Sequence, residues 1–194
     1  MNKLSIAAAA SVTEAGLKTA RLGQRFGRLD LQSQLSLLAV AELKTDFSDF
    51  ANGRVGIVFA ASAGSLSTDV NFWNSRNGAG GPGPTLFAYT LPSAAIGEIA
   101  IHFKLTGPDL CFVGDGRELL REAADMISRG EADACNCVFC EAVTADCAQV
   151  ISAVPAAAAY AVLVKRGGGI MELPDFDRDI KSFCALLSSS KSAG

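Results

Sequence analysis

The sequence predicts an α/β three-layer sandwich. Short apolar runs with the length of strands alternate with segments of helical periodicity, and glycine-bearing turns separate the two. One run, Arg54 to Ala60, is apolar almost throughout, as expected for a strand buried on both faces. The chain has 194 residues, 49% of them apolar, which suits one domain with a complete core. We expect residues 1–187 to form that domain and the serine-rich residues 188–194 to form a disordered tail.

Five predicted strands follow one another along the chain. The first consists of small residues, which favours a place in the middle of a covered sheet; the alternative for this N-terminal stretch is a short signal peptide. The five strands are Leu4–Val12, Arg54–Ala60, Asp109–Val113, Asp133–Val143 and Ala156–Lys165.

Helical periodicity predicts the segments between these strands. Leu31, Leu35 and Leu38 form one apolar stripe, and Pro92 lies near the first turn of a later helix. Phe72 and Trp73 are expected to be packing anchors. The predicted helices are Arg28–Leu43, a helix that opens at Leu91–Ser93 and ends near Gly107, Arg117–Arg129, and a C-terminal helix within Met171–Leu187 that docks on one face of the sheet.

The stretch from Gly107 to Asp133 predicts a strand, a tight turn and a helix in immediate succession. The turn is Gly114-Asp115-Gly116, whose residue types tolerate positive φ. In many enzymes such a strand-to-helix elbow presents a nucleophile where the helix N-terminus stabilises negative charge. No serine or cysteine occupies this elbow.

Three motifs resemble the N-terminal half of β-ketoacyl synthases in the thiolase-like superfamily. They are the string from Leu86 to Phe103 followed by Gly107-Pro108, the segment Gly27-Arg28-Leu29-Asp30 followed by Gln34-Leu35, and the elbow itself. The family carries Thr-Ala-Cys-Ala-Ser-Gly at the elbow and Arg-x-Gly-x-x-Asp at the end of the following helix. The resemblance implies a five-stranded, mostly parallel sheet in the order 3-2-1-4-5.

The same resemblance marks the elbow as degenerate. Aligned without gaps from Gly130 and Asp133, Gly116 falls on the elbow glycine, Asp115 on the serine and Val113 on the nucleophilic cysteine. Cys111 misses that position by two residues. The resemblance therefore implies that the reacting thiol is missing.

The family's catalytic histidines lie in a second half, and complete ketosynthases are roughly twice as long as this chain. His102 is the only histidine here, so a Cys-His-His site cannot be assembled. We interpret His102 as a helix-face residue in preference to a general base or metal ligand. Whether the chain is an enzyme stays open. The missing nucleophilic cysteine and the missing pair of histidines argue against it.

The predicted helix from Arg117 to Arg129 is nearly half charged, whereas the family's equivalent helix lies between two halves and is largely apolar. We expect a solvated face here and interpret the chain as a half that stands alone; the alternative is that the charges meet a partner protein. The apolar stripe that should face the sheet is Leu119, Leu120, Ala123, Ala124 and Ile127.

The six cysteines do not predict a metal site. Cys135 and Cys137 should point to one face of the fourth strand and Cys140 to the other, so they cannot converge on one ion. We expect buried, reduced thiols in a cytoplasmic protein, with no metal and no cofactor. A redox pair at Cys137 and Cys140 is disfavoured because such pairs belong at a helix N-terminus.

Charge and hydropathy exclude two classes of partner. The net charge is −3 and basic residues form no dense tract, which argues against nucleic acid. No apolar run approaches the length that spans a bilayer.

The resemblance implies a dimer formed by edge-to-edge pairing of the third strand, made up of Asp109, Leu110, Cys111, Phe112 and Val113. A bare apolar edge strand would also promote aggregation, which favours assembly.

The first hypothesis is a non-catalytic, chain-length-factor-like subunit of a catalytic β-ketoacyl synthase in fatty-acid or polyketide synthesis, including aryl polyenes. In it, acyl carrier protein docks mainly on the synthase. The second is a standalone homodimeric module that binds an acyl group or another small molecule. The third is an enzyme that uses Cys111 as a displaced nucleophile.

Overall fold

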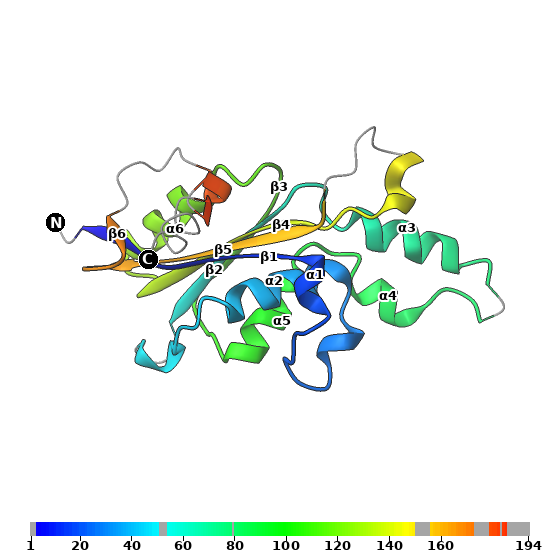
Figure 1. Ribbon diagram of the computed structural model, residues 1–194, viewed down its shortest axis with the longest axis horizontal. Helices are drawn as coiled ribbons and strands as arrows, with labels where there is room; N and C mark the ends of the chain where they lie inside the picture. The colour runs from blue at the N-terminus through cyan, green and yellow to red at the C-terminus, as the bar shows by residue number, and fades with distance from the viewer. Residues whose placement is uncertain are drawn as a thin grey trace.

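The computed structural model describes residues 3–50, 54–78, 80–149, 156–172, 179–182 and 184–185. One sheet of six strands runs through the middle of the molecule (Figure 1). Helices lie on both of its faces, so the predicted three-layer α/β sandwich is confirmed. The predicted tail, residues 188–194, lies outside the described residues.

The strand order is β3-β2-β4-β5-β1-β6, so the expected order 3-2-1-4-5 is wrong. β2 pairs in parallel with β3 and β4, while the β4–β5, β5–β1 and β1–β6 pairings are antiparallel. The sheet is therefore mixed and has six strands instead of five. The strands are β1 Leu4–Thr13, β2 Val55–Ala61, β3 Asp109–Val113, β4 Ala134–Glu141, β5 Ala158–Arg166 and β6 Met171–Glu172.

The prediction that the first strand lies in the middle of the sheet was wrong, because small residues in a strand have two explanations. Alanines fit the crowded middle of a sheet, but they also occur where few side chains press on a strand. β1 takes the second role: it pairs with β5 along its whole length, and Ala7 to Ala10 are only half-buried. The sheet's middle is instead formed by β2 and β4, whose side chains are buried almost throughout.

One face of the sheet is covered by α2 (Leu31–Ala41) and α5 (Ala94–Phe103), and the other by α6 (Leu119–Ser128). In Figure 1, α6 lies above the sheet, and α2 and α5 lie below it. Asp30 caps α2 by accepting a hydrogen bond from the backbone N–H of Ser33 at 3.0 Å. The remaining helices are α1 Glu14–Leu17, η1 Phe26–Arg28, η2 Phe47–Asp49, α3 Leu66–Ser75, α4 Pro84–Ala88 and η4 Ala145–Gln149.

α6 is amphipathic in the way the sequence predicts. All five residues of its predicted stripe are buried against the sheet, together with Met126. Arg121, Asp125 and Arg129 lie on the exposed side, where Arg121 pairs with Glu118 at 3.3 Å. The solvated face of this helix is therefore confirmed.

The C-terminal part differs from the predicted helix. Met171 and Glu172 form β6, which pairs with Ser5 and Ile6 of β1. Helical backbone follows at residues 180–182 and 184–185, where Ile180 and Cys184 are buried on the same face of the sheet as α6. A C-terminal helical segment thus does dock on one face of the sheet, as expected, and Met171 and Glu172 precede it as a strand.

Among the described residues, none of the helices has both the length and the apolar character needed to span a lipid bilayer.

Asn136 of β4 is fully buried, and neither its amide oxygen nor its amide nitrogen has a hydrogen-bond partner. Because an unpaired buried amide destabilises the folded state, Asn136→Leu is expected to raise the free energy of unfolding by about 1–3 kcal/mol. Urea denaturation measures the change. The control, Asn74→Leu on the exposed surface of α3, should change it by no more than about 0.5 kcal/mol. A destabilised Asn136→Leu protein would contradict the prediction.

Candidate functional site

The strand-to-helix elbow forms where the sequence predicts it. β3 ends at Val113, and the N–H of Gly114 donates to the carbonyl of Ala61 in β2 at 3.0 Å. Asp115 accepts a hydrogen bond from the N–H of Arg117 at 3.2 Å and pairs with its guanidinium at 2.8 Å. This local turn holds residues 115–117 outside the helix, which explains why α6 starts at Leu119 and not at Arg117.

Gly116 is required by both conformation and space. Its φ is +78°, a value that side chains rarely tolerate, and a Cβ atom there would lie 2.6 Å from Cδ2 of Phe139. The elbow is therefore packed directly against the aromatic ring of β4. This contact fixes where the end of β3 meets the start of α6.

Val113, at the expected nucleophile position, presents only methyl groups. Its side chain is 64% exposed and lies beside the β2–α3 loop, where a Cβ on Gly64 would be 3.5 Å from Val113 Cγ2 and 3.4 Å from Pro92. Asp115 is exposed, but its carboxylate is already paired with Arg117. The described part of the elbow thus offers an apolar surface and no nucleophile.

Cys111 is poorly placed to replace the missing thiol. It is half-buried and packs with residues of α2 and α5, in the interior below the edge strand. Burial, and then the nearby carboxylate of Asp109, raise the pKa of its thiol. A raised pKa leaves less reactive thiolate at neutral pH.

β3 is an edge strand, as expected. It is the outermost strand of the sheet and pairs only with β2. Pro108 and Gly114 bond to β2, so strand alternation turns the backbone N–H and C=O groups of Asp109, Cys111 and Val113 outward. This edge is a template for pairing with another strand.

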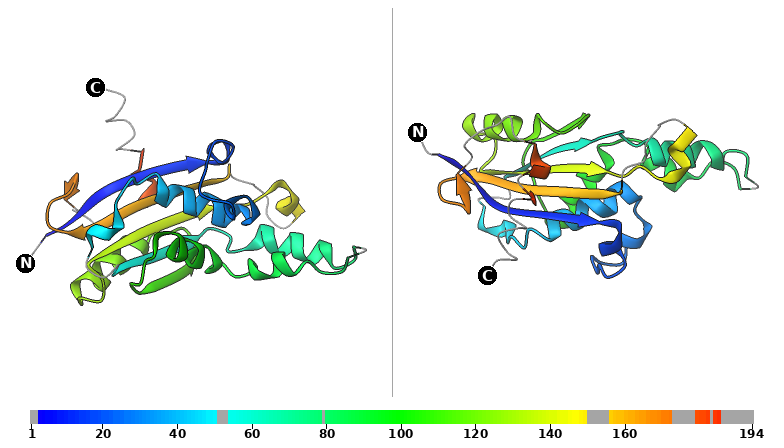
Figure 2. Two further views of the ribbon diagram at one scale, coloured as in Figure 1. Left: turned by 90° about the horizontal axis from the view of Figure 1, so that it is seen from below. Right: turned by 45° about the horizontal axis from the view of Figure 1, so that its top comes forward.

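An arm formed by α3 and α4 extends beyond the end of the sheet (Figures 1 and 2). The sequence prediction that Trp73 is a packing anchor is wrong, because its side chain is 60% exposed with the Arg76 guanidinium 3.2 Å from the ring centroid. Phe72 does pack, 5.5 Å from the ring of Phe87. Three large apolar residues are exposed on this arm and at its return to the core: Trp73, Phe87 and Leu91.

Buried hydroxyls fasten the base of the arm. Ser65 donates to the carbonyl of Thr90 at 2.7 Å, and Thr68 donates to Asp30 at 3.0 Å. Gln32 of α2 donates to the carbonyl of Pro92 at 3.1 Å. The arm is thus tied to the N-terminus of α2, and its return to the core lies near Val113, because Pro92 and Val113 both lie within 4 Å of where a Cβ on Gly64 would stand.

The edge-and-arm surface consists of the free edge of β3, Val113, and the exposed Trp73, Phe87 and Leu91. Sequence reasoning found the strand but missed the arm, because these apolar residues do not repeat at helical spacing and lie among glycines and prolines. Exposed apolar groups with aromatic and arginine side chains are typical of protein interfaces.

The described residues contain no cluster of three or more histidine, cysteine or acidic side chains that could hold a metal ion. Cys135 and Cys137 face α6 and Cys140 faces α2, in agreement with the predicted alternation. Burial raises the pKa of Cys135 and Cys140 to about 12. His102 is exposed on α5, with its ring 4.7 Å from that of Phe103, as a helix-face residue would be.

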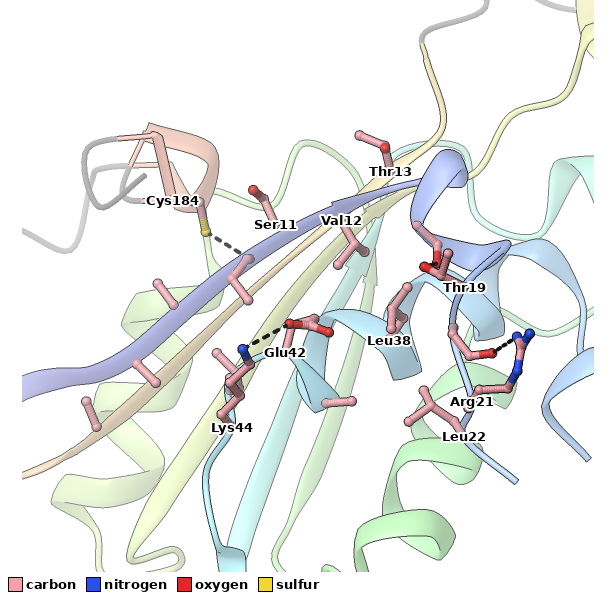
Figure 3. A pocket seen from close by; sticks show the side chains of 18 of the residues that line it. Ser11, Val12, Thr13, Thr19, Arg21, Leu22, Leu38, Glu42, Lys44 and Cys184 are labelled. Carbon is pink, nitrogen blue, oxygen red and sulfur yellow. Dashed lines mark hydrogen bonds and ion pairs between the residues drawn. The ribbon is translucent and has the colours of Figure 1, made fainter. Parts of the chain in front are cut away.

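A long open groove that the sequence did not predict runs beside β1 (Figure 3). It has a volume of about 1150 Å³ and is bounded by β1, the end of α2 and the segment after α1. A smaller hollow of about 560 Å³ adjoins it, with Leu17 and Phe26 in its lining. The exposed basic residues beside the hollow are Lys18, Arg21, Arg25 and Arg28, with no acidic residue between Glu14 and Asp30.

No protein-family model matches the chain, and no curated protein matches it. Solved structures do. The ishigamide ketosynthase/chain length factor matches with a TM-score of 0.66 and 17% identity, over 84% of this chain and 62% of that one. This chain thus spans less than two thirds of that neighbour's length.

Two complexes give similar matches. One is the ketosynthase ApeO with its chain length factor ApeC from Xenorhabdus doucetiae, with a TM-score of 0.64 and 16% identity over 87% of this chain and 81% of that one. The other, AntDE:AntF, is a type II PKS acyl-carrier protein in complex with its ketosynthase, with a TM-score of 0.68 and 14% identity over 86% of this chain and 63% of that one. This chain therefore has the thiolase-like fold of ketosynthase and chain length factor proteins.

The elbow generates a stability prediction. Gly116→Ala should lower the free energy of unfolding by about 2–4 kcal/mol, because the methyl group meets Phe139 and strains a positive φ. The control is Gly97→Ala within α5, where nothing lies within 4 Å of the added Cβ; this change should raise stability by up to about 1 kcal/mol. Thermal and urea unfolding measure both. Equal effects of the two substitutions would show that the elbow is not tightly packed.

Alkylation tests Cys111. With iodoacetamide at pH 7, Cys111 should react more slowly than a cysteine in an unstructured peptide, because its pKa is raised and each unit lowers the thiolate fraction about tenfold. Mass spectrometry locates the label, and Cys111→Ser identifies background labelling. Faster labelling than in the peptide would instead favour a displaced nucleophile.

Proposed function

We propose that this chain is a non-catalytic ketosynthase-like subunit, similar to a chain length factor, that assembles with a catalytic β-ketoacyl synthase. The pathway is fatty-acid or polyketide synthesis, including aryl polyenes. Its role is to complete the acyl tunnel of the synthase and steady the neighbouring active site. We place this assembly in the cytoplasm, where the free cysteines stay reduced.

The observation that carries this proposal is the combination of the free edge of β3 with a strand-to-helix elbow that lacks its nucleophile. Val113 closes β3 with an exposed aliphatic side chain, at the position where the family resemblance puts the reacting cysteine. The same residue belongs to the edge-and-arm surface. An elbow without a nucleophile, next to an exposed strand edge, favours a subunit that binds a partner over an enzyme that acts alone.

The arm extends this interface. A strand edge of five residues gives only a few main-chain hydrogen bonds, whereas Trp73, Phe87 and Leu91 add exposed apolar area that a partner can bury. Leu91 adjoins Pro92, which lies near Val113 at Gly64, so the return of the arm and the end of the strand edge can share one contact. The complex of the ketosynthase ApeO with its chain length factor ApeC supports a synthase partner, and the complex AntDE:AntF supports an acyl-carrier protein as a further partner.

Acyl carrier protein is a further partner in this proposal. It docks mainly on the synthase, and the basic residues from Lys18 to Arg28 give this chain an exposed positive region for an acidic protein. Arg25 is already paired with Glu98 at 3.5 Å, which leaves Lys18, Arg21 and Arg28 as the main attraction. Such contacts act mostly on the association rate and weaken with salt.

The alternative is a standalone homodimeric module that binds an acyl group or another small molecule. The groove beside β1 favours it, because alanines and aliphatic side chains line a large part of that groove. This alternative needs no synthase partner. The third hypothesis, catalysis by Cys111, has less support because the thiol is half-buried.

Co-expression tests the subunit hypothesis. Co-expressed with a catalytic β-ketoacyl synthase of its source organism, the chain should elute from size-exclusion chromatography as a stable mixed dimer. Val113→Asp should weaken this dimer by roughly tenfold or more, because a carboxylate would be buried in the contact. The measurement is the dissociation constant by titration calorimetry or interferometry.

The matched control is Ile101→Asp on α5. Ile101 is 66% exposed and Val113 is 64% exposed, but Ile101 lies outside the edge-and-arm surface. Its substitution should leave the mixed dimer unchanged. A chain that stays separate from the synthase while binding a long-chain acyl probe would overturn the subunit hypothesis in favour of the standalone module.

A further inference from the structure

The sheet has a second open edge, and it belongs to β1. β6 pairs only with Ser5 and Ile6, so the stretch from Ala7 to Thr13 has a strand neighbour on one side alone within the described chain. Figure 2 shows β1 along one margin of the sheet, opposite β3. The groove of Figure 3 follows this margin.

Hydrogen bonding identifies the backbone groups that face outward. The N–H of Glu14 donates to the carbonyl of Ala157 at 3.3 Å, so Glu14 faces the β5 side. Strand alternation then turns Thr13, Ser11 and Ala9 to the open side. Each of these residues presents one N–H and one C=O to the groove.

The edge residues themselves, Ala7 to Thr13, carry none of the usual protections against pairing. Natural edge strands are usually protected by charged side chains, prolines or bulges that twist the edge away. The sequence from Ala7 to Thr13 contains no charge and no proline, and the one irregularity in pairing with β5 lies at its start, between Ile6 and Ala8. The side chains are small, so a second strand can approach along residues 9–13.

We infer that this edge pairs with the same edge of a second copy of the chain, in an antiparallel arrangement with the two-fold axis at Ser11. Ser11 then lies opposite Ser11 of the second copy, and Ala9 opposite Thr13. Each outward pair exchanges two backbone hydrogen bonds, at a Cα separation of about 5.5 Å. The interface is self-complementary, as a two-fold dimer requires.

Charge around the axis fits the second copy. Glu42 and Lys44 line the groove beside the middle of the edge, and their charged groups are 3.9 Å apart (Figure 3). A two-fold axis at Ser11, perpendicular to the sheet, puts the Glu42–Lys44 pairs of the two copies on the same face in opposite order, so that Glu42 of one copy can approach Lys44 of the other. A partner with a single sign of charge would meet one of these two side chains unfavourably, whereas an identical copy matches both.

This inference stands apart from the proposed function, because it uses β1 and leaves β3 free. Both edges can be occupied together. Two copies then form the centre of an extended sheet, and a synthase pairs at each outer β3 edge.

A charge-swap experiment on the isolated full-length chain tests the pairing. Wild type should be a dimer by light scattering after size-exclusion chromatography. Ser11→Lys and Ser11→Glu should each be monomeric, with dimer affinity reduced by roughly tenfold or more, because like charges face each other across the axis. An equal mixture of the two variants should form dimers again.

Ser128→Lys is the matched control, since Ser128 is exposed on α6 and does not line the groove beside Ala7 to Thr13; it should remain dimeric. Circular dichroism confirms that each variant is folded. A monomeric wild type at tens of micromolar would overturn the inference. So would a dimer that persists in Ser11→Lys, because that result places the contact elsewhere, such as β3. Failure of the mixed variants to pair would show that the edge takes a different occupant.

Discussion

The fold depends on burying both faces of two neighbouring strands. β2 is buried at every position, and β4 at every position except Glu141, so each face of this pair needs its own helical cover. α2 and α5 supply one cover, and α6 with the C-terminal helical segment supplies the other. Among the described residues, β3 has a strand neighbour on one side alone, and β6 covers β1 only at Ser5 and Ile6, so each edge of the sheet is left open along most of its length.

Much of this architecture could be predicted from sequence. The hydrophobic run of β2, the stripe of α6 and the alternation of cysteines in β4 all follow from local periodicity, and the structure agrees with each. The position of β1 does not follow from local periodicity, because sheet order is decided by which strands pair over long distances. Alanine gives little information here, since it suits both a crowded centre and a sparsely covered margin. The resemblance to ketosynthases implied the order 3-2-1-4-5, which has β1 in the middle of the sheet, and the structure has β1 near the margin instead.

The sequence predicts the tight turn of the elbow, but it does not predict which residues pack against that turn. Gly114 to Gly116 indicated a tight turn, yet nothing in the sequence relates Gly116 to Phe139, which is 23 positions away. The exposure of the apolar residues on the arm was likewise not predictable from the sequence, because solvent exposure of Trp73 depends on where α3 and α4 leave the core.

Phe139 connects two regions that are otherwise distant in the chain. Its ring lies against Gly116 on one side, and the ammonium group of Lys181 is 4.8 Å from its centroid; Lys181 is also held by Glu141 at 2.8 Å. Rotation of this one ring would disturb both the turn after β3 and the helical segment near the chain's end.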